Sequence, residues 1–283
     1  MSDERRPHRI RKAAGTIVVM IAVVLGLSFT PAGAEARSTA RPTIVFVHGA
    51  FADAGSWAGS IRDLQVRGYP VIAPANPLRG LSGDSAYLRS VLSTISGPII
   101  LVGHSYGGAV ITNAANGNTN VKALVYVAAY ALDEGESVEE ANHLGGANSD
   151  LLPYIDLRPY PDAPVIDPST GQRDLDAYLK QDAFRSIFAA DVPAAQASVM
   201  AATQRPITLS SRGEKSGPAA WKTIPSWYLV AHNDKALPAV AERIMAARAK
   251  ASTVEVRSSH AAMVSHPEDV TALILKAVRK TAA

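Results

Sequence analysis

The sequence predicts an α/β fold with a doubly wound, mainly parallel sheet and an inserted helical cap. Six apolar segments alternate with segments of helical periodicity, which is typical of parallel strands joined by crossover helices. Residues 99–102 are aliphatic throughout and residues 43–47 are β-branched or apolar throughout, as strands covered on both faces should be. The alternation stops between residues 130 and 222, and an interruption of this length indicates an inserted cap rather than a loop.

Apolar character and bounding glycines or prolines place the strands of the sheet at residues 43–47, 68–74, 99–102, 121–129, 226–231 and 253–256. Apolar residues at helical spacing place helices at residues 55–67, 82–96, directly after residue 105, 238–248 and 267–280. The core is therefore expected at residues 37–129 and 223–283. The cap is expected at residues 130–222, with amphipathic stretches around 175–188 and 193–202.

Size and composition indicate a folded chain with one large core. The chain has 283 residues, of which 47% are hydrophobic, and this excludes a disordered protein. Its net charge is +3, but five basic and three acidic side chains lie in the first 36 residues, which leaves +1 for the rest. This balance argues against a nucleic-acid partner. Because the chain has no cysteine, its stability must come from the core rather than from disulfides.

Residues 1–36 have the pattern of a cleavable secretory signal. A basic stretch at residues 5–12 precedes an apolar run at 15–29, and small residues follow with cleavage expected after Ala34 or Ala36. The alternative is an uncleaved membrane anchor, because the run is near the lower length limit of a spanning helix. We expect a secreted or extracytoplasmic protein that meets the membrane only through this signal before cleavage.

Ser105 lies in the pattern Gly103-His104-Ser105-Tyr106-Gly107, directly after a predicted strand and before a predicted helix. The flanking glycines permit a tight strand-to-helix turn that raises the serine hydroxyl out of the sheet. The helix that follows directs free backbone N–H groups toward the same place, where negative charge would be stabilised. The pattern therefore predicts that Ser105 is a nucleophile.

A serine hydroxyl needs a base and a third group that holds the base in the right tautomer. Asp234 and His260 each follow the end of a predicted strand, and the carboxyl ends of parallel strands meet at one edge of a sheet. We predict His260 as the base; its rival, His266, stands at the entry to the final helix. Asp234 is preferred to Asp133 as the acid because a short connection brings it beside the His260 loop.

The loop after the first strand supplies a second element of the predicted site. Gly49 allows the N–H of Ala50 to turn inward, where it could meet the N–H of Tyr106 and form an oxyanion hole. An apolar pocket is expected above Ser105, although the cap aromatics could instead form a small core of their own. The expected substrate contacts are Phe51, His104, Tyr154, Phe184 and Phe188.

From about residue 41 onward the chain resembles the α/β-hydrolase superfamily. The resemblance lies in His48-Gly49-Ala50, in Gly103-His104-Ser105-Tyr106-Gly107-Gly108, in Asn233-Asp234 and in Ser259-His260-Ala261-Ala262-Met263. It is most similar to the branch that contains plant methyl-ester esterases and hydroxynitrile lyases, with related bacterial secreted hydrolases.

This resemblance implies a triad of Ser105, Asp234 and His260, an oxyanion hole from the amides of Ala50 and Tyr106, and neither cofactor nor metal. The lyases of the branch carry a threonine where Gly49 stands and a lysine where Ala261 stands. Without that lysine a departing cyanide would lack a positive partner, so cyanohydrin cleavage is disfavoured.

These observations predict a secreted serine hydrolase that cleaves carboxylic esters of small to medium apolar substrates through an acyl-enzyme. Its partner would be a small-molecule ester. Two alternatives keep the same triad: an acyltransferase, in which another acceptor replaces water, and a cofactor-free perhydrolase, in which peroxide does. A third alternative is a non-catalytic protein that binds a small ligand on the same scaffold, because a fold does not dictate a function.

Overall fold

A six-stranded sheet forms the centre of the computed structural model, which describes residues 41–281; the predicted signal at 1–36 lies outside these residues. The strand order is β11-β10-β4-β3-β1-β2, and each neighbouring pair is parallel. The predicted doubly wound sheet is confirmed. The strands are β1 (Thr43–Val47), β2 (Val71–Ile72), β3 (Ile99–Ser105), β4 (Val121–Ala129), β10 (Ser226–Ala231) and β11 (Ser252–Val256).

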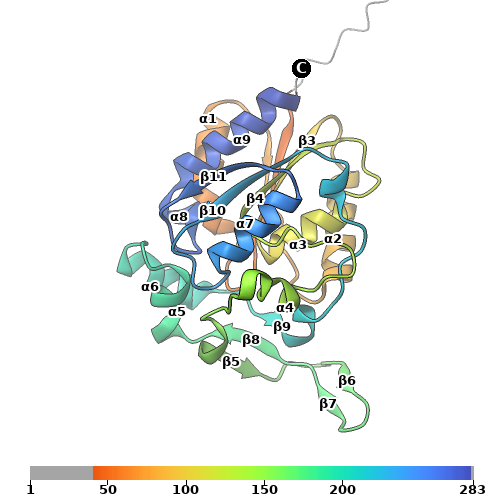
Figure 1. Ribbon diagram of the computed structural model, residues 1–283, viewed down its shortest axis with the longest axis vertical. Helices are drawn as coiled ribbons and strands as arrows, with labels where there is room; N and C mark the ends of the chain where they lie inside the picture. The colour runs from red at the N-terminus through yellow and green to blue at the C-terminus, as the bar shows by residue number, and fades with distance from the viewer. Residues whose placement is uncertain (1–40, 282–283) are drawn as a thin grey trace, which may run out of the picture. The chain divides into compact units, whose positions relative to one another are not determined.

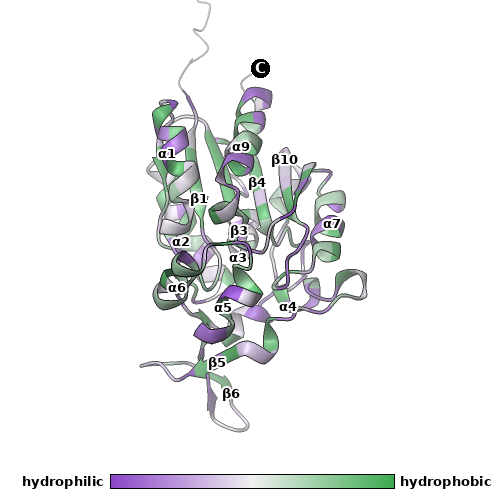
Figure 2. Cartoon of the chain, turned by 90° about the vertical axis from the view of Figure 1, so that its left-hand side faces the viewer, coloured by the Kyte–Doolittle hydropathy of each residue, from purple (hydrophilic) through white to green (hydrophobic). Residues whose placement is uncertain are grey.

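The central strands carry the aliphatic runs because they are covered on both faces. Every residue of β1, β3 and β10 is buried, as is every residue of β4 except Lys122. Figure 2 shows this hydrophobic interior and the more hydrophilic outward faces of the helices. The edge strand β11 is partly exposed, which explains its mixed sequence Ser-Thr-Val-Glu-Val.

Helices flank the sheet on both faces (Figure 1). α1 packs against α9, and α2 packs against α3. Among the helices of residues 41–281, none combines the length and the apolar character that a membrane crossing requires. The helices of the core are η1 (Ala54–Trp57), α1 (Ala58–Val66), α2 (Leu81–Ser93), α3 (Tyr106–Ala114), α7 (Ala239–Arg248), α8 (Ala262–Ser265) and α9 (Pro267–Thr281).

The segment between β4 and β10 contains short strands as well as the helices that the sequence predicts. β5 (Ile155–Arg158), β8 (Asp176–Leu179) and β9 (Ile207–Thr208) form an antiparallel sheet, and β6 (Val165–Asp167) pairs with β7 (Gln172–Arg173). Figure 1 shows these strands beyond the carboxyl ends of the central strands. Most are partly exposed and too short to form an apolar run.

The same segment contains several short helices, two of which lie within the predicted amphipathic stretches. These two are α5 (Gln181–Phe188) and α6 (Ala194–Thr203), which pack against each other. The others are α4 (Val138–Ala141), η2 (Leu144–Gly146), η3 (Leu152–Tyr154), η4 (Leu209–Arg212) and η5 (Ala220–Lys222). The stretch expected around 175–188 thus begins as strand β8 and becomes helical only at Gln181.

The order of the strands places a ligand site next to β1. The chain passes from β1 outward to β2 and then returns to the other side of β1 as β3, from which the sheet grows toward β11. The loops that leave β1 and β3 therefore diverge and open a crevice at the carboxyl edge of the sheet. This crevice is where the structure places Ala50 and Ser105.

Candidate active site

Ser105 is the last residue of β3, and α3 begins at the next residue. Its backbone has a φ of 52° and a ψ of −126°, a conformation that is rare for a residue with a side chain. Gly107 makes the turn possible: a Cβ there would lie 2.3 Å from the carbonyl oxygen of Val47. The strained turn presents Ser105 at the wall of a cavity.

Asp234 and His260 are hydrogen-bonded to each other. Asp234 Oδ2 accepts from His260 Nδ1 at 2.5 Å, and both side chains are almost completely buried. Asp234 Oδ1 accepts from the N–H groups of Ala236 (2.7 Å) and Leu237 (2.8 Å), which fixes the carboxylate. The proton of the neutral imidazole is therefore held on Nδ1, and Nε2 is left as an acceptor.

Ser105 and His260 line the same cavity, which has a volume of about 250 Å³. Among the hydrogen bonds within residues 41–281, none joins the Ser105 hydroxyl to His260; such contacts are often long in enzymes without substrate. Ala50 and Tyr106 line this cavity as well. The N–H of Tyr106 belongs to the first turn of α3, where backbone donors have no partner within the helix.

The sequence matches the model described as the alpha/beta hydrolase family over residues 44–273. The chain belongs to this family. It is 27% identical over 245 residues to a pyrethroid hydrolase of Sphingobium wenxiniae, a match that covers 80% of this chain and 83% of the relative. It is 34% identical over 107 residues to a carbendazim hydrolyzing esterase of a Nocardioides species, but that match spans only 33% of this chain and 44% of the relative.

The fold of this alpha/beta hydrolase is also similar to that of a methylesterase from Arabidopsis. The two structures superpose with a TM-score of 0.65 at 21% identity, over 84% of this chain and 99% of the other. The predicted resemblance to the α/β-hydrolase superfamily is confirmed, and the fold resembles that of a plant methylesterase.

The loop after β1, which carries Ala50, is fixed by His48 and Asn76. His48 Nδ1 donates to the carbonyl oxygen of Gly49, and His48 Nε2 accepts from the N–H of Asn76, both at 2.9 Å. The Asn76 amide donates in turn to the carbonyl oxygen of His48 at 3.0 Å. Burial lowers the pKa of His48, so its ring stays neutral and keeps both bonds.

His104, Phe184 and Phe188 do not line the cavity, contrary to the sequence prediction. His104 Nε2 donates to the carbonyl oxygen of His260 at 3.0 Å, and the two rings are 4.6 Å apart. Phe188 packs edge-on against His260 at 4.8 Å, and Phe184 packs against Phe188. All three side chains are fully buried, so they hold His260 in place from behind.

Of the two remaining predicted substrate contacts, one lines the cavity and the other does not. Phe51 lines the cavity, whereas Tyr154 is 39% exposed and lies outside the lining. The cap contributes aliphatic side chains where the sequence analysis expected aromatic ones, among them Leu151, Leu152 and Ile155. Isolated leucines in an irregular segment give no periodic signal that could have identified them.

Asp84 holds the side chain of Tyr106, whose N–H is a candidate for the oxyanion hole. The sequence analysis did not identify this role of Asp84. The Tyr106 hydroxyl donates to Asp84 Oδ2 at 2.9 Å, and the N–H of Arg79 donates to both carboxylate oxygens at 3.1 and 3.2 Å. Asp84 is completely buried, and burial raises its pKa. Its partners come from other parts of the chain, so no local motif reveals the contact.

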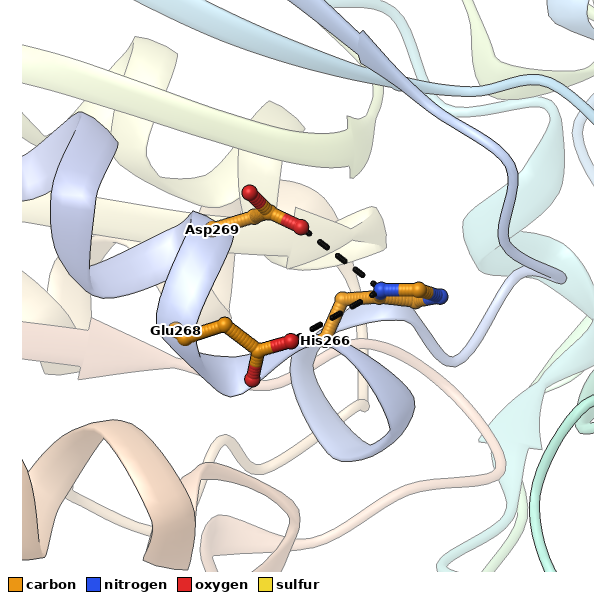
Figure 3. Close-up of side chains that lie close together, drawn as sticks. All are labelled: His266, Glu268 and Asp269. Carbon is orange, nitrogen blue, oxygen red and sulfur yellow. Dashed lines mark ion pairs between the residues drawn. The ribbon is translucent and has the colours of Figure 1, made fainter.

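Asp133 and His266, the rival candidates for the acid and the base, form ion pairs near the surface. Asp133 forms an ion pair with Lys222 at 2.5 Å. His266 faces Glu268 at 3.9 Å and Asp269 at 3.6 Å (Figure 3). These three side chains have the residue types and spacing of a metal site, but both carboxylates are exposed to solvent and no further feature points to an ion. Neither rival lines the cavity.

Glu242 is a buried acid beside the candidate triad. It lies on α7 with no exposed surface, and its Oε2 accepts from the N–H of Ala231, the last residue of β10. Its Oε1 has no hydrogen-bond partner among the described residues. Burial raises the pKa of the Glu242 carboxyl well above 4.5, and the nearby charge of Asp234 raises it further. We therefore expect a neutral carboxylic acid here.

The free energy of unfolding of the variant Glu242→Gln should increase relative to that of wild type as the pH rises. The pKa of Glu242 is higher in the folded protein than its unfolded value of 4.5. Its stabilising contribution to the folded state is therefore complete below pH 4.5 and is lost as the pH rises toward the folded pKa. Each unit of that pKa rise corresponds to about 1.4 kcal/mol, and glutamine does not titrate. Chemical denaturation of both proteins from pH 4 to pH 9 measures the difference.

The exposed variant Glu134→Gln is the control for this comparison. A difference between wild type and Glu242→Gln that stays constant across the pH range would show that folding does not raise the pKa of Glu242.

Proposed function

We propose that this protein is a secreted serine hydrolase that cleaves carboxylic esters of small to medium apolar substrates. The observation that carries the proposal is the buried hydrogen bond between Asp234 and His260, in a cavity that Ser105 also lines. The names of the esterase and hydrolase relatives support ester cleavage. Export rests on the signal pattern of residues 1–36.

In the first half-reaction, Ser105 Oγ attacks the carbonyl carbon of the ester while its proton passes to His260 Nε2. Asp234 stabilises the resulting imidazolium. The carbonyl oxygen becomes an oxyanion and accepts hydrogen bonds from the N–H groups of Ala50 and Tyr106. His260 then gives its proton to the departing alcohol, and an acyl-enzyme on Ser105 remains.

In the second half-reaction, water attacks the carbonyl carbon of the acyl-enzyme and His260 takes a proton from it. The intermediate collapses, His260 returns the proton to Ser105 Oγ, and the carboxylic acid leaves. The mainly apolar cavity of about 250 Å³ suits a small or medium acyl or alcohol group.

Two positions favour ester hydrolysis over cyanohydrin cleavage. A Cβ at Gly49 would lie 2.6 Å from Ser105 Cβ and 2.8 Å from the carbonyl oxygen of His104, so the threonine of the similar lyases does not fit this backbone. Ala261 is fully buried and carries no charge to hold a departing cyanide.

A fluorophosphonate probe should label the wild-type protein at Ser105, because only an activated serine reacts rapidly with it. Peptide mass spectrometry locates the label. A series of 4-nitrophenyl esters of increasing acyl length then reports the depth of the pocket, with the highest kcat/KM expected for short and medium chains. Tight binding of a small ligand with neither labelling nor turnover would instead identify a binding protein.

A further inference from the structure

One part of the cavity wall is polar. Most side chains that line the cavity are apolar, and the polar ones other than Ser105 and His260 include Asn142, Ser149 and Arg212. Arg212 is the one lining side chain within residues 41–281 that carries a permanent charge. A cation in an apolar wall loses part of its hydration, which costs free energy unless a partner or a ligand replaces the lost water.

Hydrogen bonding leaves mainly donors free on this part of the wall. The Tyr130 hydroxyl donates to Asn142 Oδ1 at 2.8 Å, which occupies the acceptor end of that amide. The two amide hydrogens of Asn142 have no partner within the described residues. Ser149 is already satisfied, because its hydroxyl donates to the carbonyl oxygen of Ala236 and accepts from the N–H of Leu151.

Arg212 is only weakly paired. Its one hydrogen bond within residues 41–281 goes from Nη2 to Glu139 Oε1 at 3.4 Å, near the limit for such a bond. The Glu139 side chain is 56% exposed, whereas that of Arg212 is 27% exposed. Asn142 directly follows α4, which packs against η4, and Arg212, Tyr130 and Asn142 all line the same cavity. Arg212 and the Tyr130–Asn142 pair are therefore neighbours.

The backbone that carries Arg212 is firmly held. Arg212 is the last residue of η4, and Ser210 in the same short helix bonds to Asp174 through its N–H (3.1 Å) and its hydroxyl (2.6 Å). Asp174 is itself buried. The hydroxyls of Thr208 and Ser211 bond to each other at 2.5 Å. The backbone at Arg212 is thus held in place, so binding has to order only the side chain of Arg212.

We propose that Arg212 and Asn142 form a subsite for a second acceptor group on the ester substrate, a carboxylate above all. The inference rests on the proposed function and specifies its substrate class: half-esters of dicarboxylic acids. The planar guanidinium can donate two parallel hydrogen bonds to a carboxylate, which replaces the long contact to Glu139. The apolar walls then pack against the carbon chain between the ester and the carboxylate.

The test compares methyl half-esters of dicarboxylic acids with neutral methyl esters of the same chain length, from four to eight carbons. Alkali uptake at constant pH gives kcat/KM for each. Wild type should cleave at least one half-ester as efficiently as the neutral ester of the same length. Without a subsite such as Arg212, the carboxylate of a half-ester would weaken its binding in an apolar cavity. Arg212→Met should lower the ratio of half-ester to neutral-ester kcat/KM about 10- to 100-fold, the range of a charge-assisted hydrogen bond.

Two further variants separate the subsite from general electrostatics. Arg212→Lys keeps the charge and should retain part of the ratio. Lys215→Met also removes one positive charge, but Lys215 pairs with Glu140 outside the cavity lining, so this variant should keep the wild-type ratio.

Four outcomes would count against the inference. A wild-type ratio in Arg212→Met, or an equal fall in Lys215→Met, overturns it. A wild-type protein that cleaves neutral esters but no half-ester overturns the subsite and leaves the proposed function intact. Cleavage of neither kind of ester overturns the proposed function itself.

Discussion

The variant Ser105→Ala is expected to lower kcat for 4-nitrophenyl butyrate by about 10⁴- to 10⁶-fold, the range seen when a catalytic triad acts as a unit. Loss of the hydroxyl removes the side-chain nucleophile, so the acyl-enzyme cannot form. The residual rate would come from substrate binding and from the oxyanion hole. Steady-state kinetics on extensively purified variant and wild type measure the difference.

The fold should survive this substitution. Alanine is smaller than serine, and the Ser105 side chain is held by the strained turn rather than by packing that an alanine would lose. Thermal unfolding checks this point. Ser60→Ala is a matched control, because Ser60 is also a buried serine but bonds to Pro267 outside the cavity. Ester cleavage by Ser105→Ala at the wild-type rate would reject Ser105 as the nucleophile.

The sheet could be predicted from sequence because its strands are buried on both faces. β4 and β10 occur at the predicted bounds, since mainly apolar runs have few other ways to be buried. The short strands between β4 and β10 were missed for the opposite reason. β5 reads Ile-Asp-Leu-Arg, is partly exposed, and pairs with β8 through contacts that no local pattern specifies.

The candidate site shows the same division between local and distant information. Ser105 ends β3, and Asp234 and His260 follow the ends of β10 and β11, so the topology of a parallel sheet was enough to group them. Asp84 and Glu242 act through partners on other elements, and neither stands in a recognisable motif. Arg212 lines the cavity from a short helix that Asp174 holds in place, an arrangement that no sequence spacing indicates.

The variant Asp234→Asn should lower kcat by about 10⁴-fold, the loss expected when a triad histidine is held in the wrong tautomer. The asparagine oxygen would keep the N–H bonds from Ala236 and Leu237, because those donors need an acceptor. Its amide N–H₂ would then face His260 Nδ1 and force the ring proton onto Nε2. In that tautomer Nε2 of His260 has no free lone pair with which to accept the Ser105 proton.

Asp133→Asn is the matched control for this result, because Asp133 follows β4 in the chain as Asp234 follows β10. It pairs with Lys222 at the surface and should leave kcat near the wild-type value. The binding of substrate should change little in Asp234→Asn, because Asp234 lies behind His260 and does not line the cavity. A small loss in Asp234→Asn together with a large loss in Asp133→Asn would reverse the two roles and require a different orientation of His260.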